Sequence, residues 1–93
     1  TMTKIERHTE ICKRRTELYA SKNSDYGDSF SRARTEVPYY TLGKLYDKFM
    51  RYKNLTLCNG NPKVKTESVT DTLSDLANYC IMELVEREIS QEK

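Results

Sequence analysis

The stretch that decides the fold is residues 67–84, which read ESVTDTLSDLANYCIMEL. Its apolar side chains recur every three or four residues, at Val69, Leu73, Leu76, Cys80 and Leu84. This spacing is typical of one face of an α-helix and differs from the strict alternation of a half-buried strand. We therefore predict a helix over roughly residues 67–90, with this stripe in the core and with Thr66 or Ser68 as its N-cap.

Two further segments have the same periodicity. One covers roughly residues 3–22. The other covers roughly residues 42–57, follows Thr41 as a predicted N-cap, and has an apolar stripe made of Leu42, Leu45, Tyr46, Phe49 and Met50. Residues 23–41 between them are expected to form a long loop, or a loop with a short helix over 29–35.

No segment alternates like a strand, so the predicted fold class is all-α: a bundle of three main helices in a single domain over residues 2–91. A chain of 93 residues buries only a modest core. We therefore expect the bundle to be completed in a homo-oligomer. Thr1 before Met2 is interpreted as the remnant of a cloning tag.

The composition excludes several classes of protein. Sixteen basic and fourteen acidic residues leave a net charge of +2, which is not the strong basic excess of a protein that coats long nucleic acids. The three cysteines lie far apart, so reduced thiols are expected rather than a disulfide framework or a zinc site. No apolar run approaches the ~20 residues of a membrane span and no secretory signal opens the chain, which predicts a cytoplasmic protein without a membrane partner.

An acidic line runs along the predicted helix over 67–90. Glu67, Asp71 and Asp75 are spaced four residues apart and stack on one face, opposite the apolar stripe. Carboxylates at this spacing can bind Mg²⁺ and leave other positions for substrate phosphates. The same line is also typical of a solvated helix face near the N-terminal end of the helix dipole. Both interpretations stay open.

A basic line runs along the predicted helix over 42–57. Lys44, Lys48 and Arg51 fall on one face, again opposite the apolar stripe. They can bind phosphates, and Arg51 can do so with two parallel hydrogen bonds. They can equally pair with the acidic line or remain solvated, in which case each pair contributes about 0–1 kcal/mol.

The turn DYGDSF, residues 25–30, follows the first helix beside Lys22. A glycine there allows a positive φ angle, and backbone N–H groups gathered in such a turn can hold an anion. The two aromatic side chains either anchor the turn on the core or present a ring to a nucleobase. We predict that phosphate binds at Lys22 and that the pocket is shaped by Asp25, Tyr26, Gly27, Ser29 and Phe30.

Other polar and aromatic residues extend this candidate site. The chain has seven tyrosines and no tryptophan, and tyrosine rings suit a nucleotide pocket as well as a subunit interface. We predict base stacking by Tyr26 or Tyr40 and a polar contact from Asn78, which continues the acidic line. Arg15 interrupts the apolar seam of the first helix, and an inward arginine needs an anion or a carboxylate. No nucleophile–base pair, P-loop or zinc spacing is present, so no catalytic residue is assigned.

Three pieces of the sequence occur together in a fixed order: KNSDYGDSF at 22–30, DKFMR at 47–51, and ESVTDTLSDLANY at 67–79. Through these pieces the chain resembles the nucleotide-modification-associated domain type 1 family, a small helical family found largely in bacteriophages. The resemblance implies a phage origin and work on nucleotides.

A more distant similarity is to the MazG-type all-α nucleoside triphosphate pyrophosphatases, which hold Mg²⁺ with carboxylates from two helices. Here Glu67, Asp71 and Asp75 would supply one half of that cluster. The helix over 42–57 offers only Asp47 for the other half, which leaves too few ligands for two-metal chemistry unless a neighbouring subunit supplies them.

Three functions follow from these observations. The first is a protein that sequesters a phosphorylated nucleotide, including a cyclic one, in the cytoplasm of an infected bacterium, by analogy with the small "sponge" proteins of phages. The second is a nucleotide pyrophosphatase with Mg²⁺ as its cofactor. The third is a helical module that binds another protein. We favour the first, with a small nucleotide as the ligand and no firm cofactor.

Overall fold

The computed structural model describes residues 1–26, 28–58 and 62–92, apart from the side chains of residues 24–26 and 62–66. Four helices make up this part of the chain: α1 (Lys4–Tyr26), α2 (Ser29–Glu36), α3 (Tyr40–Leu57) and α4 (Pro62–Glu92). The described ranges contain no strand, so the predicted all-α class is confirmed. The alternative with a short helix between the first two long ones is also confirmed, since α2 occupies that segment.

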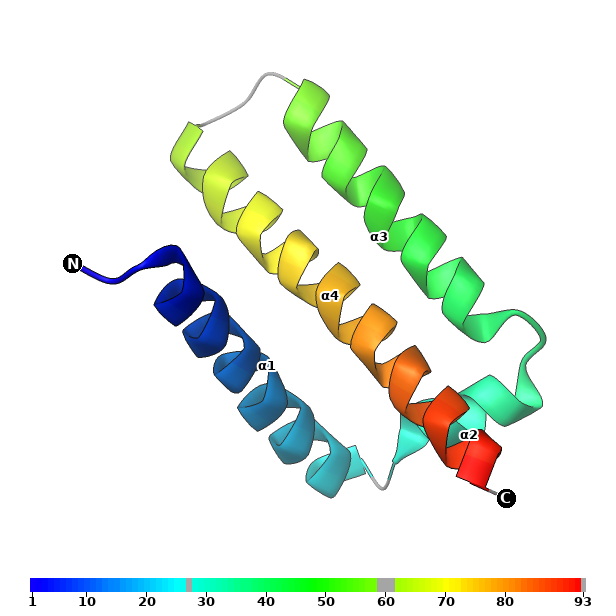
Figure 1. The fold of residues 1–93 in the computed structure, drawn as a ribbon. Coiled ribbons are helices and arrows are strands. Elements are labelled where there is room, and N and C mark those ends of the chain that lie inside the picture. The colour runs from blue at the N-terminus through cyan, green and yellow to red at the C-terminus, as the bar shows by residue number, and fades with distance from the viewer. Residues whose placement is uncertain (27, 59–61, 93) are drawn as a thin grey trace.

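The helix α4 lies between α1 and α3 (Figure 1). It runs antiparallel to α3, with which it makes the most extensive contact, and α1 packs more lightly on another side of it. The short helix α2 carries the chain across one end of this arrangement and contacts α3. The end of α1 is thereby placed close to the middle of α4 and the start of α3.

The core of the chain is small. Among the described side chains only Phe30, Thr41 and Thr72 are buried. The ring of Phe30 contacts two tyrosines, with centroid distances of 5.9 Å to Tyr40 and 6.1 Å to Tyr79. This aromatic cluster joins α2, α3 and α4. Of the two uses predicted for Phe30, anchoring the turn on the core is therefore confirmed.

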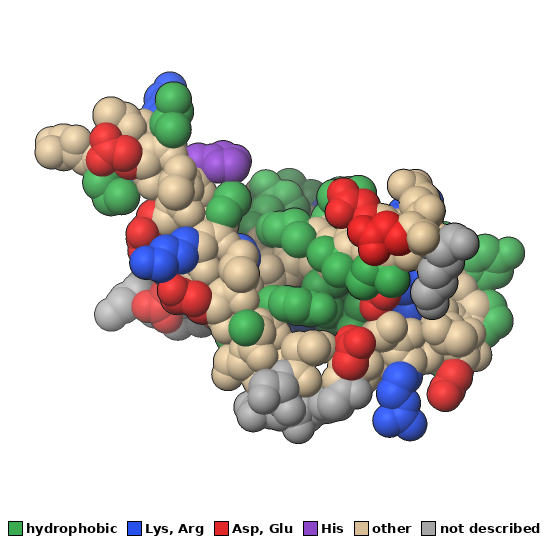
Figure 2. Space-filling model, turned by 60° about the horizontal axis from the view of Figure 1, so that its bottom comes forward, with side chains coloured by type: hydrophobic (Ala, Val, Ile, Leu, Met, Phe, Trp, Pro, Cys, Tyr) green, Lys and Arg blue, Asp and Glu red, His purple; other side chains and the backbone are tan. Residues whose placement is uncertain are grey.

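The apolar stripes that we predicted as core are largely open to solvent. Leu42 and Tyr46 of α3 are each 65% exposed, and Leu84 of α4 is 60% exposed. Figure 2 shows hydrophobic side chains open to solvent over the centre of the face that it presents. Leu45, Met50, Val69 and Leu76 of the predicted stripes are half-buried. For the remaining members the prediction was wrong in a single chain, because two packed helices bury only a narrow seam.

Polar contacts also cross the seam between α3 and α4. Lys48 Nζ lies 3.1 Å from Asp75 Oδ2, which confirms the predicted pairing of the basic line with the acidic line at this position. One helical turn further on, Arg51 Nε donates a hydrogen bond of 3.3 Å to Thr72 Oγ1. At the other end of the seam, Thr41 Oγ1 donates a hydrogen bond of 2.7 Å to Glu83 Oε1.

The predicted helix starts were also wrong. Tyr39, with a φ of 59°, occupies the N-cap position of α3. Thr41 lies inside the helix, and its hydroxyl donates to Glu83 rather than capping the helix. The helix α4 begins at Pro62, whose fixed φ suits the first helical position. Thr66 and Ser68 are therefore internal residues of α4 rather than caps.

Candidate functional site

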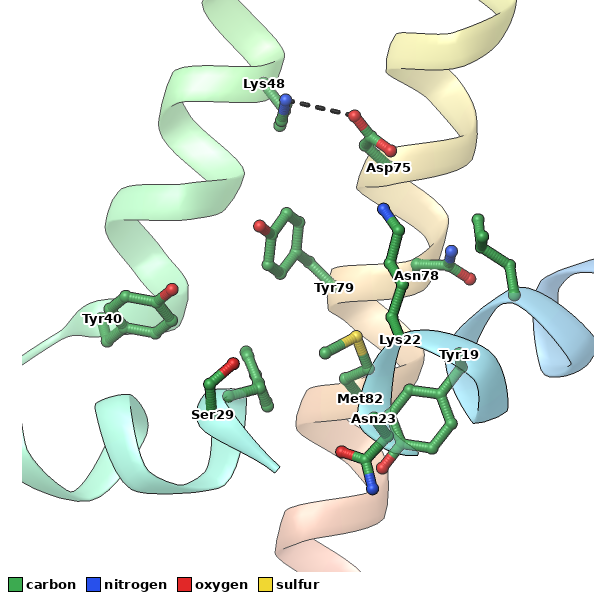
Figure 3. Close-up of a pocket in the computed structure, with 12 residues that line it drawn as sticks. Tyr19, Lys22, Asn23, Ser29, Tyr40, Lys48, Asp75, Asn78, Tyr79 and Met82 are labelled. Carbon is green, nitrogen blue, oxygen red and sulfur yellow. Dashed lines mark ion pairs between the residues drawn. The ribbon is translucent and has the colours of Figure 1, made fainter. Parts of the chain in front are cut away.

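A cavity of about 330 Å³ lies where the end of α1 meets α2, α3 and α4 (Figure 3). All four helices contribute to it, and α2 does so through Ser29 and Phe30. The N–H of Asp28 donates a hydrogen bond of 3.3 Å to the carbonyl of Asn23, and this bond closes the end of α1. Asp28 itself has a φ of 58° and occupies the N-cap position of α2 without a side-chain capping hydrogen bond.

Two lysines from different helices stand at one end of the cavity. Lys48 of α3 pairs with Asp75, and the two side chains are 25% and 40% exposed. Lys22 of α1 points toward this end as well (Figure 3). Two positive charges and one negative charge therefore meet there, which leaves an excess positive charge at the cavity mouth. A phosphate group can be bound at such a place by charge-assisted hydrogen bonds.

Aromatic side chains form another part of the wall. Phe30, Tyr40 and Tyr79 line the cavity as one cluster. Tyr40 is held from outside by Lys44, whose Nζ lies 5.4 Å from the centroid of the ring. These rings, with the thioether of Met82 nearby, offer the flat apolar surface that a nucleobase requires.

Tyr19 adds a hydroxyl to the same cavity. Its pKa is raised chiefly by burial of the phenol, and also by the carboxylates of Asp28 and Glu86. The phenol therefore stays protonated at neutral pH and can donate a hydrogen bond to a ligand oxygen. Asn78 of α4 and Ser29 of α2 supply further hydrogen-bonding groups.

Of the predicted ligand-binding residues, the structure brings six to this cavity. They are Lys22, Ser29, Phe30, Tyr40, Lys48 and Asn78. Asp75, from the predicted metal set, lines it too. The side chains of Asp25 and Tyr26, in the last turn of α1, and the whole of Gly27 lie outside the described residues.

The other three predicted residues lie elsewhere. Arg51 is bonded to Thr72 and lines a shallower cavity along the seam, and Lys44 lies over Tyr40. Arg15 points inward as predicted, since its Nε is buried, and this atom has no hydrogen-bond partner among the described groups. It does not line the cavity in Figure 3.

The predicted metal ligands are not gathered at one point. Residues four apart are separated by about 6 Å along a helix axis, so Glu67 and Asp75 stand about 12 Å apart along α4. Glu67 and Asp71 are exposed, and Asp75 is paired with Lys48. Within the described residues no group of three or more histidine, cysteine or carboxylate side chains is placed to hold a metal ion.

Sequence reasoning missed a cluster centred on Glu83. Arg34 donates two hydrogen bonds of 2.8 Å to this carboxylate, and Thr41 and Arg87 donate one each at 2.7 Å. The hydrogen bond from Arg34 is the main reason that the pKa of Glu83 lies well below its ordinary value, with Thr41 and Arg87 adding to the effect. No motif marks this cluster, because Arg34 precedes Glu83 by 49 residues.

Residues 22–86 match the family described as nucleotide modification associated domain 1. The chain belongs to this family. The resemblance predicted from the three pieces of sequence is therefore confirmed. The match of this nucleotide modification associated domain covers every residue of the cavity in Figure 3 except Leu18 and Tyr19, which lie on the preceding turns of α1.

No curated protein and no solved structure matches the chain. The similarity to MazG-type pyrophosphatases stays a prediction. In the part of the chain that the structure describes, no helix is long and apolar enough to cross a lipid bilayer.

Proposed function

We propose that this protein binds a phosphorylated nucleotide in the cavity between α1, α2, α3 and α4 and holds it without cleaving it. The observation that carries the proposal is the meeting of two lysines with an aromatic cluster in one cavity. Lys22 and Lys48 neutralise the phosphate, and Tyr40 or Tyr79 stacks on the base. Asn78 hydrogen-bonds an edge of the base, and Tyr19 donates to a phosphate or sugar oxygen.

The size of the cavity suits one nucleotide unit. Its 330 Å³ lies near the lower end of the range of about 300–1,000 Å³ that is usual for ligand pockets. A cyclic nucleotide with two or more units would place one unit inside and extend the others over the mouth, past Lys48 and Asp75. The ligand class therefore includes linear and cyclic phosphorylated nucleotides.

In the cell, this binding would sequester a nucleotide signal. We infer that the protein is a phage protein that acts as a homo-oligomer in the cytoplasm of the infected bacterium, where it lowers the concentration of a nucleotide that the host uses in defence. The family description connects these proteins with nucleotides, which agrees with a nucleotide ligand. Sequestration requires tight binding and slow release rather than a catalytic group.

One experiment tests both whether a nucleotide is bound and whether it is chemically changed. Purified protein with Mg²⁺ is mixed with a panel of nucleoside triphosphates and cyclic oligonucleotides and filtered, and the retained fraction is then heat-denatured and analysed by chromatography. We expect one nucleotide to be depleted from the filtrate and released intact, with or without Mg²⁺. Conversion to a monophosphate and pyrophosphate, or retention that requires the metal, would contradict the proposal and favour the pyrophosphatase alternative.

A lysine substitution localises the site. Lys48→Ala should weaken retention about ten- to hundredfold, since a hydrogen bond to a charged group contributes about 1.5–3 kcal/mol. Lys53→Ala is the matched control, because Lys53 lies on the same helix and is exposed away from the cavity. Equal retention by the two variants would mean that the nucleotide binds elsewhere.

A further inference from the structure

A single chain exposes too much surface to be the finished unit. Its accessible area is 7602 Å², whereas a compact protein of its mass, 10.9 kDa, exposes about 5,600 Å². Its radius of gyration is 15.3 Å, against about 12 Å for a compact domain of this length. The excess is about 2,000 Å², and it matches the area that a chain buries in a large homodimer interface.

Part of this excess comes from apolar side chains of α3 and α4. Leu42 and Tyr46 are 65% exposed, and Phe49 is 53% exposed. On α4, Leu73 is 44% exposed and Leu84 is 60% exposed. Cys80, between them, is exposed as well. We call these six residues the open face.

On α4 the open face and the cavity lie on opposite sides of the seam. Each residue turns a helix by about 100° relative to the residue before it. Tyr79 and Glu83 point toward α2 and α3. Cys80 and Leu84 each come one residue later and are therefore turned to one side of the seam. Asn78 and Met82 each come one residue earlier and are turned to the other side, where they line the cavity with α1.

The same rotation applies on α3. Thr41 and Lys48 point toward α4, and Leu42 and Phe49 each come one residue later. Because α3 and α4 run antiparallel (Figure 1), a turn in the same sense from the seam places both sets of side chains on the same side of the pair. The six residues therefore form one continuous apolar face, and α1 lies on the other side.

We propose that two copies of this chain pair through the open face. Two α3–α4 hairpins then pack as a four-helix bundle around a two-fold axis, in which each residue of one face meets the same face of its partner. A second copy is the occupant because the single chain has only three buried side chains among those described, and the open face gathers six exposed apolar and thiol side chains on one side of α3 and α4. The six residues of the open face are themselves uncharged.

This pairing leaves both nucleotide cavities accessible, because they lie on the outer sides of the two hairpins. The proposal does not rest on the proposed function. A chain that fails to bind nucleotides can still form the dimer, and a substitution in the open face can be examined for its assembly alone.

Sedimentation velocity on the full chain tests the pairing. We expect a mass twice the 10.9 kDa of the chain, and a return to that single-chain mass for Phe49→Glu, whose carboxylate would be buried against its own copy. Ile5→Glu is the matched control, since Ile5 is an apolar residue of α1 that is 79% exposed and lies outside the open face. This control should leave the dimer intact. A single-chain mass for the unchanged protein at micromolar concentration would overturn the proposal, as would an assembly that Phe49→Glu does not alter.

A second measurement needs no substitution, so it holds even where Phe49→Glu fails to fold. Cys12 and Cys80 are both exposed in one chain, but only Cys80 belongs to the open face. With a maleimide reagent under native conditions, followed by peptide mass spectrometry, Cys12 should be modified quickly, and Cys80 only after the dimer dissociates. Equal rates at the two thiols would overturn the proposal. Loss of the protection of Cys80 on dilution would support it.

Discussion

The carboxylate of Glu83 joins three helices, and replacing it with the isosteric amide is the most direct test of what holds them together. Glu83 of α4 accepts hydrogen bonds from Arg34 of α2, Thr41 of α3 and Arg87 of its own helix. Its side chain is 17% exposed, so most of these contacts are shielded from water. In Glu83→Gln the amide nitrogen faces the guanidinium of Arg34, and the charge on the acceptor is lost.

The size of the effect follows from the individual contacts. A hydrogen bond to a charged group contributes about 1.5–3 kcal/mol, and Arg34, which is 29% exposed, belongs at the lower end of this range. Arg87 is 67% exposed and lies four residues further along the helix, so its pair contributes about 0.3–0.5 kcal/mol. We therefore expect Glu83→Gln to lower the free energy of unfolding by about 2–3 kcal/mol, and the melting temperature by roughly 10–20 °C.

Urea unfolding monitored by far-ultraviolet circular dichroism measures this difference at fixed protein concentration, because a dimer makes the midpoint depend on concentration. Glu17→Gln is the control, since Glu17 is an exposed glutamate of α1. It should change the free energy by less than about 0.5 kcal/mol. If Glu83→Gln matches this control, the cluster makes no net contribution and the reasoning is wrong.

The same carboxylate predicts a pH dependence. The pKa of Glu83 in the folded chain lies well below its ordinary value of 4.5, so the unfolded state binds the proton more readily. The stabilisation is therefore fully present above about pH 5 and is lost progressively as the pH falls below that value. Glu83→Gln should remove this part of the acid sensitivity. An unchanged slope of stability against pH between about 5 and 2 would refute the assignment.

Three other substitutions probe the seam and the core. Asp75→Asn frees Lys48 from its partner and should strengthen nucleotide binding by up to about fivefold in titration calorimetry, because an exposed ion pair contributes about 0–1 kcal/mol. A metal-dependent enzyme would instead lose activity. Gly43→Ala should raise the free energy of unfolding by about 1 kcal/mol, because an added Cβ meets nothing within 4 Å; a loss in urea unfolding would show that something packs there. Phe30→Ala should lower the free energy of unfolding by about 3–5 kcal/mol, since it removes the central ring of the aromatic cluster. A small loss in urea unfolding would show that this cluster is not the core.

The sequence alone could predict the helices because side-chain periodicity is a local property. The stripe from Val69 to Leu84 identified α4, and the stripe from Leu42 to Met50 identified α3. It could not predict the helix starts, because a threonine before an apolar run looks like a cap. Thr41 is instead a buried donor to Glu83, a partner 42 residues away that no local pattern marks.

Part of the candidate site could be predicted, because local sequence patterns identify several of the residues that line it. Lys22, Ser29 and Phe30 were named from the turn, and Lys48 and Asn78 from the charged lines, and all of them line the cavity. The pairing of Lys48 with Asp75 required the register between α3 and α4, which spacing within either helix does not contain. Periodicity tells which side chains share a face, but not what covers that face.

Adjacent residues on the two long helices therefore belong to different surfaces. Lys48 points into the seam and the cavity, whereas Phe49 belongs to the open face; Tyr79 and Cys80 differ in the same way. A nucleotide that binds at Lys48 and a second copy that packs on Phe49 are separated by one residue along the chain and by the thickness of the α3–α4 pair in space. Lys48→Ala should thus weaken retention about ten- to hundredfold in an intact dimer, while Phe49→Glu should yield single chains whose cavity residues are unchanged. If the Phe49→Glu chain is folded and still retains nucleotide, the cavity is complete within one protomer. If it is folded and retains none, the second copy is needed to hold α3 and α4 in the register that the pair of Lys48 with Asp75 requires.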